Sequence, residues 1–370
     1  YRLQIIQNAK KFIYISTFYI DVKKYGAAFI HELMNAQNRN VKVILIIDSF
    51  GQKLGSRLMS RSERVYLDQK LHTLKEAGAK IIYYTPQTTL QKLLGSGHHV
   101  KIQLNDSGEV LFGSSNISIR SYEQWNEFSC YLKGRIILPL FDTLEYLLQN
   151  QIQSYEINND RNILAHLLQN EYKSNYSLEY HFCDPNHLQS KLHPLFDISS
   201  NSITDRLTEM IHNAKKDIQI SSFYFKPFPK LLDHLCRVAQ NGVKISVFHS
   251  HRKALPETSL AWIASFQNYS RLFKNNIIVY ENLMGEHSKL LLIDNTVAGF
   301  GSYNFEYAAH DRLIETFMFS KDIRIINGIK SIFQNLRHDT NNQQVYPSDI
   351  QKIDPMLRIK SFFPLLKKWA

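Results

Sequence analysis

The chain has 370 residues, of which 44% are hydrophobic and 21% are charged, and its formal net charge is +11. This length and composition are those of a globular protein with one large or two medium domains. No apolar run of about 18 residues occurs, which excludes a membrane-spanning helix among these residues. The 3 cysteines are too far apart for a disulfide framework or a zinc motif. The positive charge suits an anionic partner (nucleic acid, an anionic membrane or a phosphate-bearing substrate), although excess lysine also serves solubility alone.

The chain starts at Tyr1 without a methionine, and residues 2–8 read as the middle of a helix, so we expect further sequence upstream. Alternating predicted strands and helices follow. In chain order they are a helix end and a strand within 8–19, a helix at 27–36, strands at 41–47 and 80–84, a strand that carries His99 and Lys101, and a short strand that ends at Gly113-Ser114.

A second copy of this order begins at Asn213, where 213–224 matches 8–19. It continues with a helix at 231–239, strands at 243–248 and 277–280, a strand that carries His287 and Lys289, and a short strand that ends at Gly301-Ser302. Each half therefore reads β-α-β-α-β-β-β with a closing helix. This order predicts an α/β fold in which each half is a mixed β-sheet flanked by helices.

The repeats also predict a domain organisation. We place a first half at 1–150, a connector at 151–202, a second half at 203–338 and a tail at 339–370. The tail is basic, apolar and aromatic, so it could lie in a bilayer interface. Pro364 interrupts any long helix, and docking of the tail on its own domain is the interpretation that we favour.

A group of chemically particular residues occurs twice in the same register. A shift of 188 residues carries His99 to His287 and every other member of the group to its counterpart. The pairs are His99 and His287, Lys101 and Lys289, Asp106 and Asp294, Gly113 and Gly301, Ser114 and Ser302, Asn116 and Asn304, and Glu127 and Glu315. Such a match is far beyond what composition alone produces and indicates a gene duplication.

The residue types in this group favour phosphate chemistry. On a strand, positions two apart point to the same face, so His99 and Lys101 emerge side by side, and the second pair does the same. Asn116 and Asn304 each follow the next strand, after a Gly-Ser that permits close backbone approach. Two lysines, two asparagines and two serines that converge on one point suit a phosphate oxyanion.

The doubled pattern His-x-Lys-x4-Asp-x6-Gly-Ser-x-x-Asn resembles the phospholipase D superfamily over most of the chain. The strand end Asp48-Ser-Phe-Gly51 and the segment Ser222-Phe-Tyr-Phe-Lys-Pro227 resemble bacterial cardiolipin synthases, and the basic tail is similar to that of phosphatidylserine synthases. The resemblance implies two halves related by a pseudo-twofold axis, with one active site at their interface.

The resemblance also implies catalytic roles. His99 attacks phosphorus and forms a phosphohistidine, and His287 is the general acid and base. The side chains implied to hold the phosphoryl oxygens are Lys101, Lys289, Asn116 and Asn304, supported by Ser114 and Ser302. Glu127 and Glu315 accept hydrogen bonds from the histidines, one glutamate behind the histidine of each half. Asp106 and Asp294 are structural and hold the turn after each strand.

Several alternatives remain open from the sequence. Lysine is a poor zinc partner and no third ligand has the right spacing, so we expect no metal and no cofactor. An aromatic loop at 223–229 and the tail favour a phospholipid substrate and a membrane surface over nucleic acid. The charge and the tyrosines also suit a nuclease of the same superfamily. A catalytically inactive protein that binds lipid is the alternative that is not an enzyme. We expect a peripheral, membrane-associated bacterial enzyme that is active as a monomer, because one chain carries both motifs.

The second copy departs from the family pattern at one place. Arg120-Ser121 follows Asn116 as in the family, but the equivalent positions after Asn304 are Ala308-Ala309. A supporting contact of the second asparagine is therefore expected to be missing. The basic segment 249–253 is a candidate for a head-group pocket, and a solvated loop is the simpler interpretation.

Overall fold

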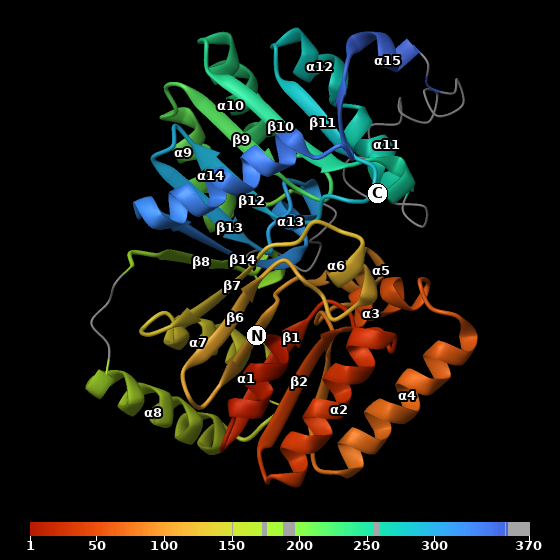
Figure 1. Ribbon diagram of the computed structural model, residues 1–370, viewed down its shortest axis with the longest axis vertical. Coiled ribbons are helices and arrows are strands. Elements are labelled where there is room, and N and C mark those ends of the chain that lie inside the picture. Colours follow the sequence, from red (N-terminus) through yellow and green to blue (C-terminus); the bar gives the residue numbers. More distant parts are fainter. Residues whose placement is uncertain (150, 172–175, 188–196, 255–258, 352, 354–370) are drawn as a thin grey trace. The chain divides into compact units, whose positions relative to one another are not determined.

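The computed structural model describes the chain except for residues 150, 172–175, 188–196, 255–258, 352 and 354–370. The described chain forms two compact units (Figure 1), one made of 1–123 and 129–176 and the other of 124–128 and 177 onward. These units and the domains predicted above are different divisions of the chain, so the domain boundaries stay a prediction. Most of the predicted tail lies outside the described residues.

The first unit is built on a mixed sheet with the strand order β3-β2-β1-β5-β6-β7. β1 and β3 pair in parallel with β2, whereas β5, β6 and β7 join antiparallel beyond β1. The strands are β1 Phe12–Thr17, β2 Lys42–Asp48, β3 Lys80–Tyr84, β5 Ile102–Asn105, β6 Glu109–Gly113 and β7 Ser129–Lys133, with a two-residue β4 at Gly97–His98.

Helices cover both faces of this sheet. They are α1 Arg2–Asn8, α2 Lys24–Asn38, α3 Ser49–Ser56, α4 Arg61–Glu76, α5 Thr89–Leu93, α6 Ile119–Glu123, α7 Ile137–Leu147 and α8 Ser154–Glu171. Ile13 and Ile15 of β1 pack with α1, α2 and α4 in one apolar cluster. Phe12 and Tyr14 point to the opposite face, where their rings contact Phe141 of α7. β1 is therefore buried on both sides, as its continuous apolar sequence predicts.

The second unit repeats this architecture with the order β11-β10-β9-β12-β13-β14, to which β15 adds at one side and β8 at the other. β9, β10 and β11 are parallel, and β12, β13 and β14 are antiparallel. The strands are β8 Glu179–Cys183, β9 Asp217–Ser221, β10 Lys244–Ser250, β11 Ile278–Asn282, β12 Leu290–Ile293, β13 Val297–Gly301, β14 Leu313–Ser320 and β15 Asn342–Val345.

The helices of the second unit again lie on both faces of the sheet (Figure 1). They are α9 Ser202–His212, α10 Pro229–Gln240, α11 Ser259–Phe266, α12 Tyr269–Lys274, α13 Tyr307–Asp311, α14 Ile323–His338 and α15 Pro347–Gln351. Short 3-10 turns occur at Pro185–His187 and Arg252–Ala254. Apolar residues of α9 and α10 share one cluster with β9 and β10, and Phe333 of α14 contacts Phe248 on the other face.

The predicted α/β fold with two duplicated halves is confirmed, because both sheets have the same strand order and the same parallel and antiparallel pairs. One detail differs from the prediction. The histidine and lysine of each motif lie just before a strand rather than within it, since β5 starts at Ile102 and β12 at Leu290. Among the described residues, no helix is long and apolar enough to cross a membrane.

Candidate active site

The first motif lies where the chain enters β5. His99 and Lys101 are both buried, and the Lys101 ammonium donates to the carbonyl oxygen of His99 at 2.7 Å. This bond holds the Lys101 side chain against the backbone of His99. Ser16 of β1 accepts a hydrogen bond from the Ile102 amide at 3.1 Å, which ties the motif to the neighbouring strand.

The second motif has the same local structure before β12. Lys289 donates to the carbonyl oxygen of His287, and Ser221 of β9 accepts from the Leu290 amide at 3.2 Å. Both side chains of the pair are again buried. The two copies thus share their contacts as well as their residue types.

An aromatic ring contacts each histidine, a contact that was not predicted from the sequence. Phe18 follows β1 and meets the His99 ring edge-on at 4.9 Å, while Lys101 lies 5.5 Å from its centre. Phe223 follows β9 and meets the His287 ring edge-on at 4.5 Å. The sequence contains an indication of this equivalence, because Phe18 and Phe223 occupy the same position when 8–19 is matched with 213–224.

Glu127 lies against the histidine of the other motif. Its Oε1 is 2.9 Å from Nδ1 of His287, and both side chains are buried. We had expected Glu127 behind His99, because both belong to the first copy. The pairing makes Nδ1 the nitrogen that faces the carboxylate and sets the orientation of the imidazole.

The segment Gln124–Phe128 carries Glu127 and belongs to the second unit. Its Asn126 amide donates to the Gly285 carbonyl, and the Asn126 carbonyl accepts from the His287 amide, both at 2.8 Å. Trp125 stacks on the His287 ring with centroids 5.0 Å apart. The sequence did not reveal this role of Trp125, whose counterpart at the shift of 188 is Leu313.

The asparagines differ in how they are held. The side-chain Oδ1 of Asn304 accepts from the backbone amide of Phe223 at 3.3 Å, and Nδ2 of the same side chain donates to Glu306 at 3.1 Å. The Asn116 amide instead donates from its backbone to the Ser121 hydroxyl at 3.2 Å. The second motif therefore orients its side-chain amide directly.

The serine and glutamate of the second motif contact each other. Ser302 donates its hydroxyl to Glu315 of β14 and accepts from the Thr316 amide at 2.9 Å. This places Ser302 as a support of Glu315, whereas we had expected it beside the phosphate-binding groups. Ser114 and Glu315 are both completely buried.

The two aspartates connect each motif to the start of its central strand. Asp106 accepts from the backbone amides of Lys10 and Phe12 at 2.9 and 3.4 Å. Asp294 accepts from the amides of Lys215 and Lys216, both at 2.7 Å. These contacts hold the segment that leads into β1 and the one that leads into β9. The predicted role at the turn after each motif strand stays a prediction.

Each lysine has a buried carboxyl group near it, supplied from a different position in each half. Burial raises the pKa of Asp48, at the end of β2, to about 7, and the Lys101 charge opposes this. Burial likewise raises the pKa of Glu286, which precedes His287, to about 7. Burial lowers the pKa of Lys289 to about 8, and the charges of nearby glutamates, of which Glu127 has the largest effect, partly oppose this decrease. The site thus balances buried charges of both signs.

A second polar cluster lies beside the second motif. His249 is buried, not part of a solvated loop, and its Nε2 lies 2.7 Å from the Tyr269 hydroxyl. That hydroxyl donates to Glu281, which also accepts from Trp262 at 2.7 Å. The cluster joins the ends of β10 and β11 to α11 and α12, so we assign it a structural role.

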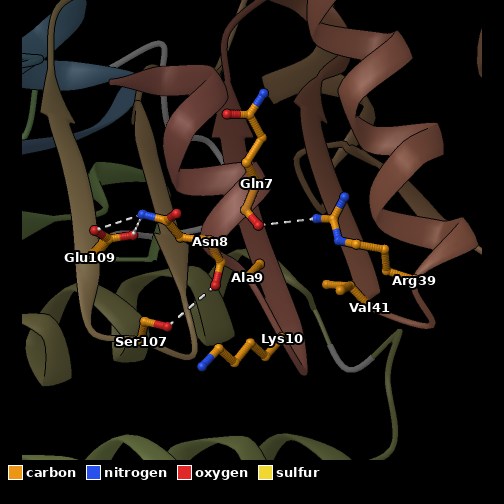
Figure 2. A pocket seen from close by; sticks show the side chains of 8 residues that line it. All are labelled: Gln7, Asn8, Ala9, Lys10, Arg39, Val41, Ser107 and Glu109. Carbon is orange, nitrogen blue, oxygen red and sulfur yellow. Dashed lines mark hydrogen bonds between the residues drawn. The ribbon is translucent and has the colours of Figure 1, made fainter.

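A shallow cavity of about 630 Å³ lies in the first unit at the start of β1 (Figure 2). Two of the side chains that line it are paired: Asn8 donates to Glu109 at 3.0 Å, and Arg39 donates to the Ile6 carbonyl at 2.9 Å. None of the motif histidines, lysines or asparagines lines this cavity. Within the described part of the chain, no group of three or more histidine, cysteine or carboxylate side chains is arranged to hold a metal ion.

Comparison with known proteins supports the duplicated architecture. A family model described as "Cardiolipin synthase, PLD-like domain" matches residues 3–145 and 207–337. Cardiolipin synthase 1 of Staphylococcus epidermidis is 22% identical over 341 residues, which cover 90% of this chain and 64% of that protein. A probable cardiolipin synthase of Bacillus subtilis is 22% identical over 89% of this chain and 62% of its own length. The chain thus spans less than two thirds of these relatives.

Among solved structures, phosphatidylserine synthase of Haemophilus influenzae superposes with a TM-score of 0.68 at 16% identity. The alignment covers 100% of this chain and 92% of that chain, which shows a shared fold. The family model covers both halves and both motifs. The chain therefore belongs to the family of phospholipase D-like domains found in cardiolipin synthases.

Proposed function

We propose that the chain is a phosphatidyltransferase of the phospholipase D type, which cleaves a phospholipid phosphodiester and passes the phosphatidyl group to an alcohol or to water. The observation that carries this proposal is the complete doubled set of histidine, lysine, asparagine and glutamate in the two motifs. Their buried lysines and the named activities of the cardiolipin synthase relatives support it.

In the proposed mechanism, His99 attacks phosphorus, and the bond from phosphorus to the leaving alcohol oxygen breaks as the phosphorus–nitrogen bond forms. His287 gives its proton to that oxygen. His287 then takes the proton of the incoming alcohol or water, whose oxygen displaces His99. The ion pair with Glu127 supports this role, because a carboxylate at Nδ1 stabilises the imidazolium and directs proton exchange to Nε2.

The charged and amide groups stabilise the phosphoryl oxygens. We assign this role to Lys101, Lys289, Asn116 and Asn304. Ser302 orients Glu315, and we propose the same support from Ser114 in the first motif. Because both motifs are present in one chain, we propose that a monomer is active at a membrane surface.

The test is an incubation of the protein with labelled phospholipid plus glycerol, and separately with single- and double-stranded DNA. The proposal expects phosphatidic acid or a phosphatidyl-alcohol and intact DNA. Nicked DNA with untouched lipid would instead identify a nuclease.

Two variants test the assignment of the histidines. His99→Ala should form no acid-labile phosphatidyl-enzyme, whereas His287→Ala should form this intermediate slowly and fail to release it. A phosphoryl-enzyme in His99→Ala, trapped with labelled substrate, would reverse the assignment.

A further inference from the structure

A buried ion pair lies directly behind the second asparagine. Lys226, in the loop between β9 and α10, has its ammonium 3.3 Å from Oε2 of Glu306, and their side chains are 1% and 6% exposed. The other oxygen of Glu306 accepts from Nδ2 of Asn304 at 3.1 Å. The three side chains form one chain of contacts that ends at a proposed phosphoryl-binding group.

The backbone holds this arrangement in place. The Lys226 amide donates to the Phe305 carbonyl at 3.0 Å, and the Phe305 amide donates to the Ser222 hydroxyl at 2.9 Å. The loop after β9 and the segment after β13 are thus fixed to each other, and the ion pair closes between them.

The first half has different chemistry at the same positions. Asp21 is the counterpart of Lys226 in the match of the two copies, and its amide donates to the Ile117 carbonyl at 3.0 Å. Ser118 stands at the position of Glu306, and Ser121, which accepts from the Asn116 amide, stands at that of Ala309. The second half therefore lacks the serine support and has an ion pair instead.

We propose that Lys226 and Glu306 are positioning residues that fix the orientation of the Asn304 amide for phosphoryl transfer. An ionised carboxylate only accepts hydrogen bonds, so it must face Nδ2, and the Phe223 amide only donates, so it must face Oδ1. One N–H of Nδ2 is given to Glu306, and the second remains for a phosphoryl oxygen.

Lys226 is the cation that contacts Glu306, and the charge of the buried Arg312 also interacts with this carboxylate. Loss of the contacting cation would leave the buried carboxylate less stabilised in its ionised form. A protonated Glu306 becomes a hydrogen-bond donor and no longer dictates which end of the Asn304 amide faces it. A turned amide would present its oxygen to the anionic phosphoryl group and repel it.

The proposal rests on the phosphatidyltransferase function and is tested by three variants. Lys226→Met and Glu306→Gln should each lower both kcat and the melting temperature. The double variant removes both charges of this ion pair and keeps the buried Arg312, which interacts with Glu306, so its melting temperature should recover in part. Its kcat should stay at least about tenfold below that of the wild-type protein, with a KM within about threefold of the wild-type value. The reason is that a glutamine at position 306 can donate as well as accept, so it does not fix the orientation of the Asn304 amide.

The matched control is Lys230→Met in α10, where the lysine is 54% exposed and should be replaceable without effect. A double variant that regains wild-type kcat would overturn the proposal, since a purely structural ion pair predicts recovery of stability and turnover together. Wild-type kcat in Lys226→Met would also overturn it.

A second measurement does not depend on turnover. The side-chain amide signals of Asn304, identified by their loss in Asn304→Ala, should shift in Lys226→Met and in the double variant but not in Lys230→Met. If the wild-type protein transfers no phosphatidyl group, the proposed function fails, and these signals alone decide the orientation of Asn304. Unshifted signals would contradict the positioning role.

Discussion

Glu127 and His287 form the most informative pair of side chains in the site. A carboxylate 2.9 Å from Nδ1 would stabilise the charged imidazole that the proposed general acid catalysis requires. The pair is buried, so its interaction is little screened by solvent.

Glu127→Gln should lower kcat by about 100-fold or more while the protein stays folded, because the amide cannot stabilise the imidazolium. Steady-state kinetics and a thermal melt measure this. In a His287→Ala background the same change should add no further loss, since the two residues act as one unit. Glu123→Gln, in a largely exposed ion pair with Lys24, is the control and should be silent. Additive losses would show that Glu127 acts elsewhere.

Lys289 predicts a pH dependence. Burial lowers its pKa to about 8, so it loses its charge as pH rises through this value, and kcat/KM should fall above about pH 8. Glu286 is an anion above its own pKa of about 7 and favours the charged lysine.

Glu286→Gln removes that anion, so the pKa of Lys289 should drop and the basic limb of the pH–rate profile should move to lower pH. A pH series of kcat/KM for both proteins measures the shift. Glu209→Gln, at an exposed position of α9, should leave the profile in place. A limb that moves to higher pH would contradict the assignment of this titration to Lys289.

At the scale of elements, the segment Gln124–Phe128 determines how the second motif is completed. Gly285 makes room for it, since its φ is +127° and an added Cβ would lie 2.3 Å from Cδ1 of Trp125. The close approach lets Trp125 cover the His287 ring.

Gly285→Ala should therefore destabilise the protein by about 2–4 kcal/mol, from backbone strain and the displaced indole. It should also lower kcat, because Trp125 and Glu127 move together. Denaturant unfolding and turnover measure the two effects. Gly328→Ala in α14 is the matched control, where the added Cβ has no neighbour within 4 Å. It should be neutral or stabilising by up to about 1 kcal/mol.

The sequence predicted those parts of the site that recur at a constant spacing. His99, Lys101, Asn116 and their counterparts were found because the duplication preserved chemistry and register together. The alternation of strands and helices in both halves followed from the same repeat, whereas the order of the strands within each sheet was not predicted. Phe18 and Phe223 were visible as a match, but a phenylalanine after a strand is usually core, so their contact with imidazoles needed coordinates.

The remaining contacts depend on tertiary packing between distant segments. Glu127 and His287 are 160 residues apart, and no local pattern indicates that the glutamate of one copy contacts the histidine of the other. Lys226 and Glu306 replace Asp21 and Ser118 of the first copy. Comparison of the repeats therefore showed that these positions differ, but it did not show that Lys226 and Glu306 form an ion pair. The sequence predicted that the second asparagine lacks a supporting contact, because Ala309 replaces the serine of the first copy. It did not predict the ion pair beside Asn304.

At the scale of the whole molecule, the net charge of +11 bears on membrane binding. An anionic surface attracts such a protein, and the attraction weakens as the Debye length shortens to about 3 Å in 1 M salt. The protein should therefore sediment with vesicles that contain anionic phospholipid and be released by about 1 M salt. Vesicles of zwitterionic lipid alone are the control. Equal, salt-resistant binding to both would show that apolar contacts dominate instead.

The pairing of Glu127 with His287 has a consequence for the ancestry of the chain. After a duplication, two copies can usually diverge or be exchanged by recombination without regard to each other. Here a crossover between the copies would separate a glutamate from the histidine that it contacts. A substitution at Glu127 would likewise change the surroundings of His287 in the other copy. We therefore expect the two repeats to be retained or lost together.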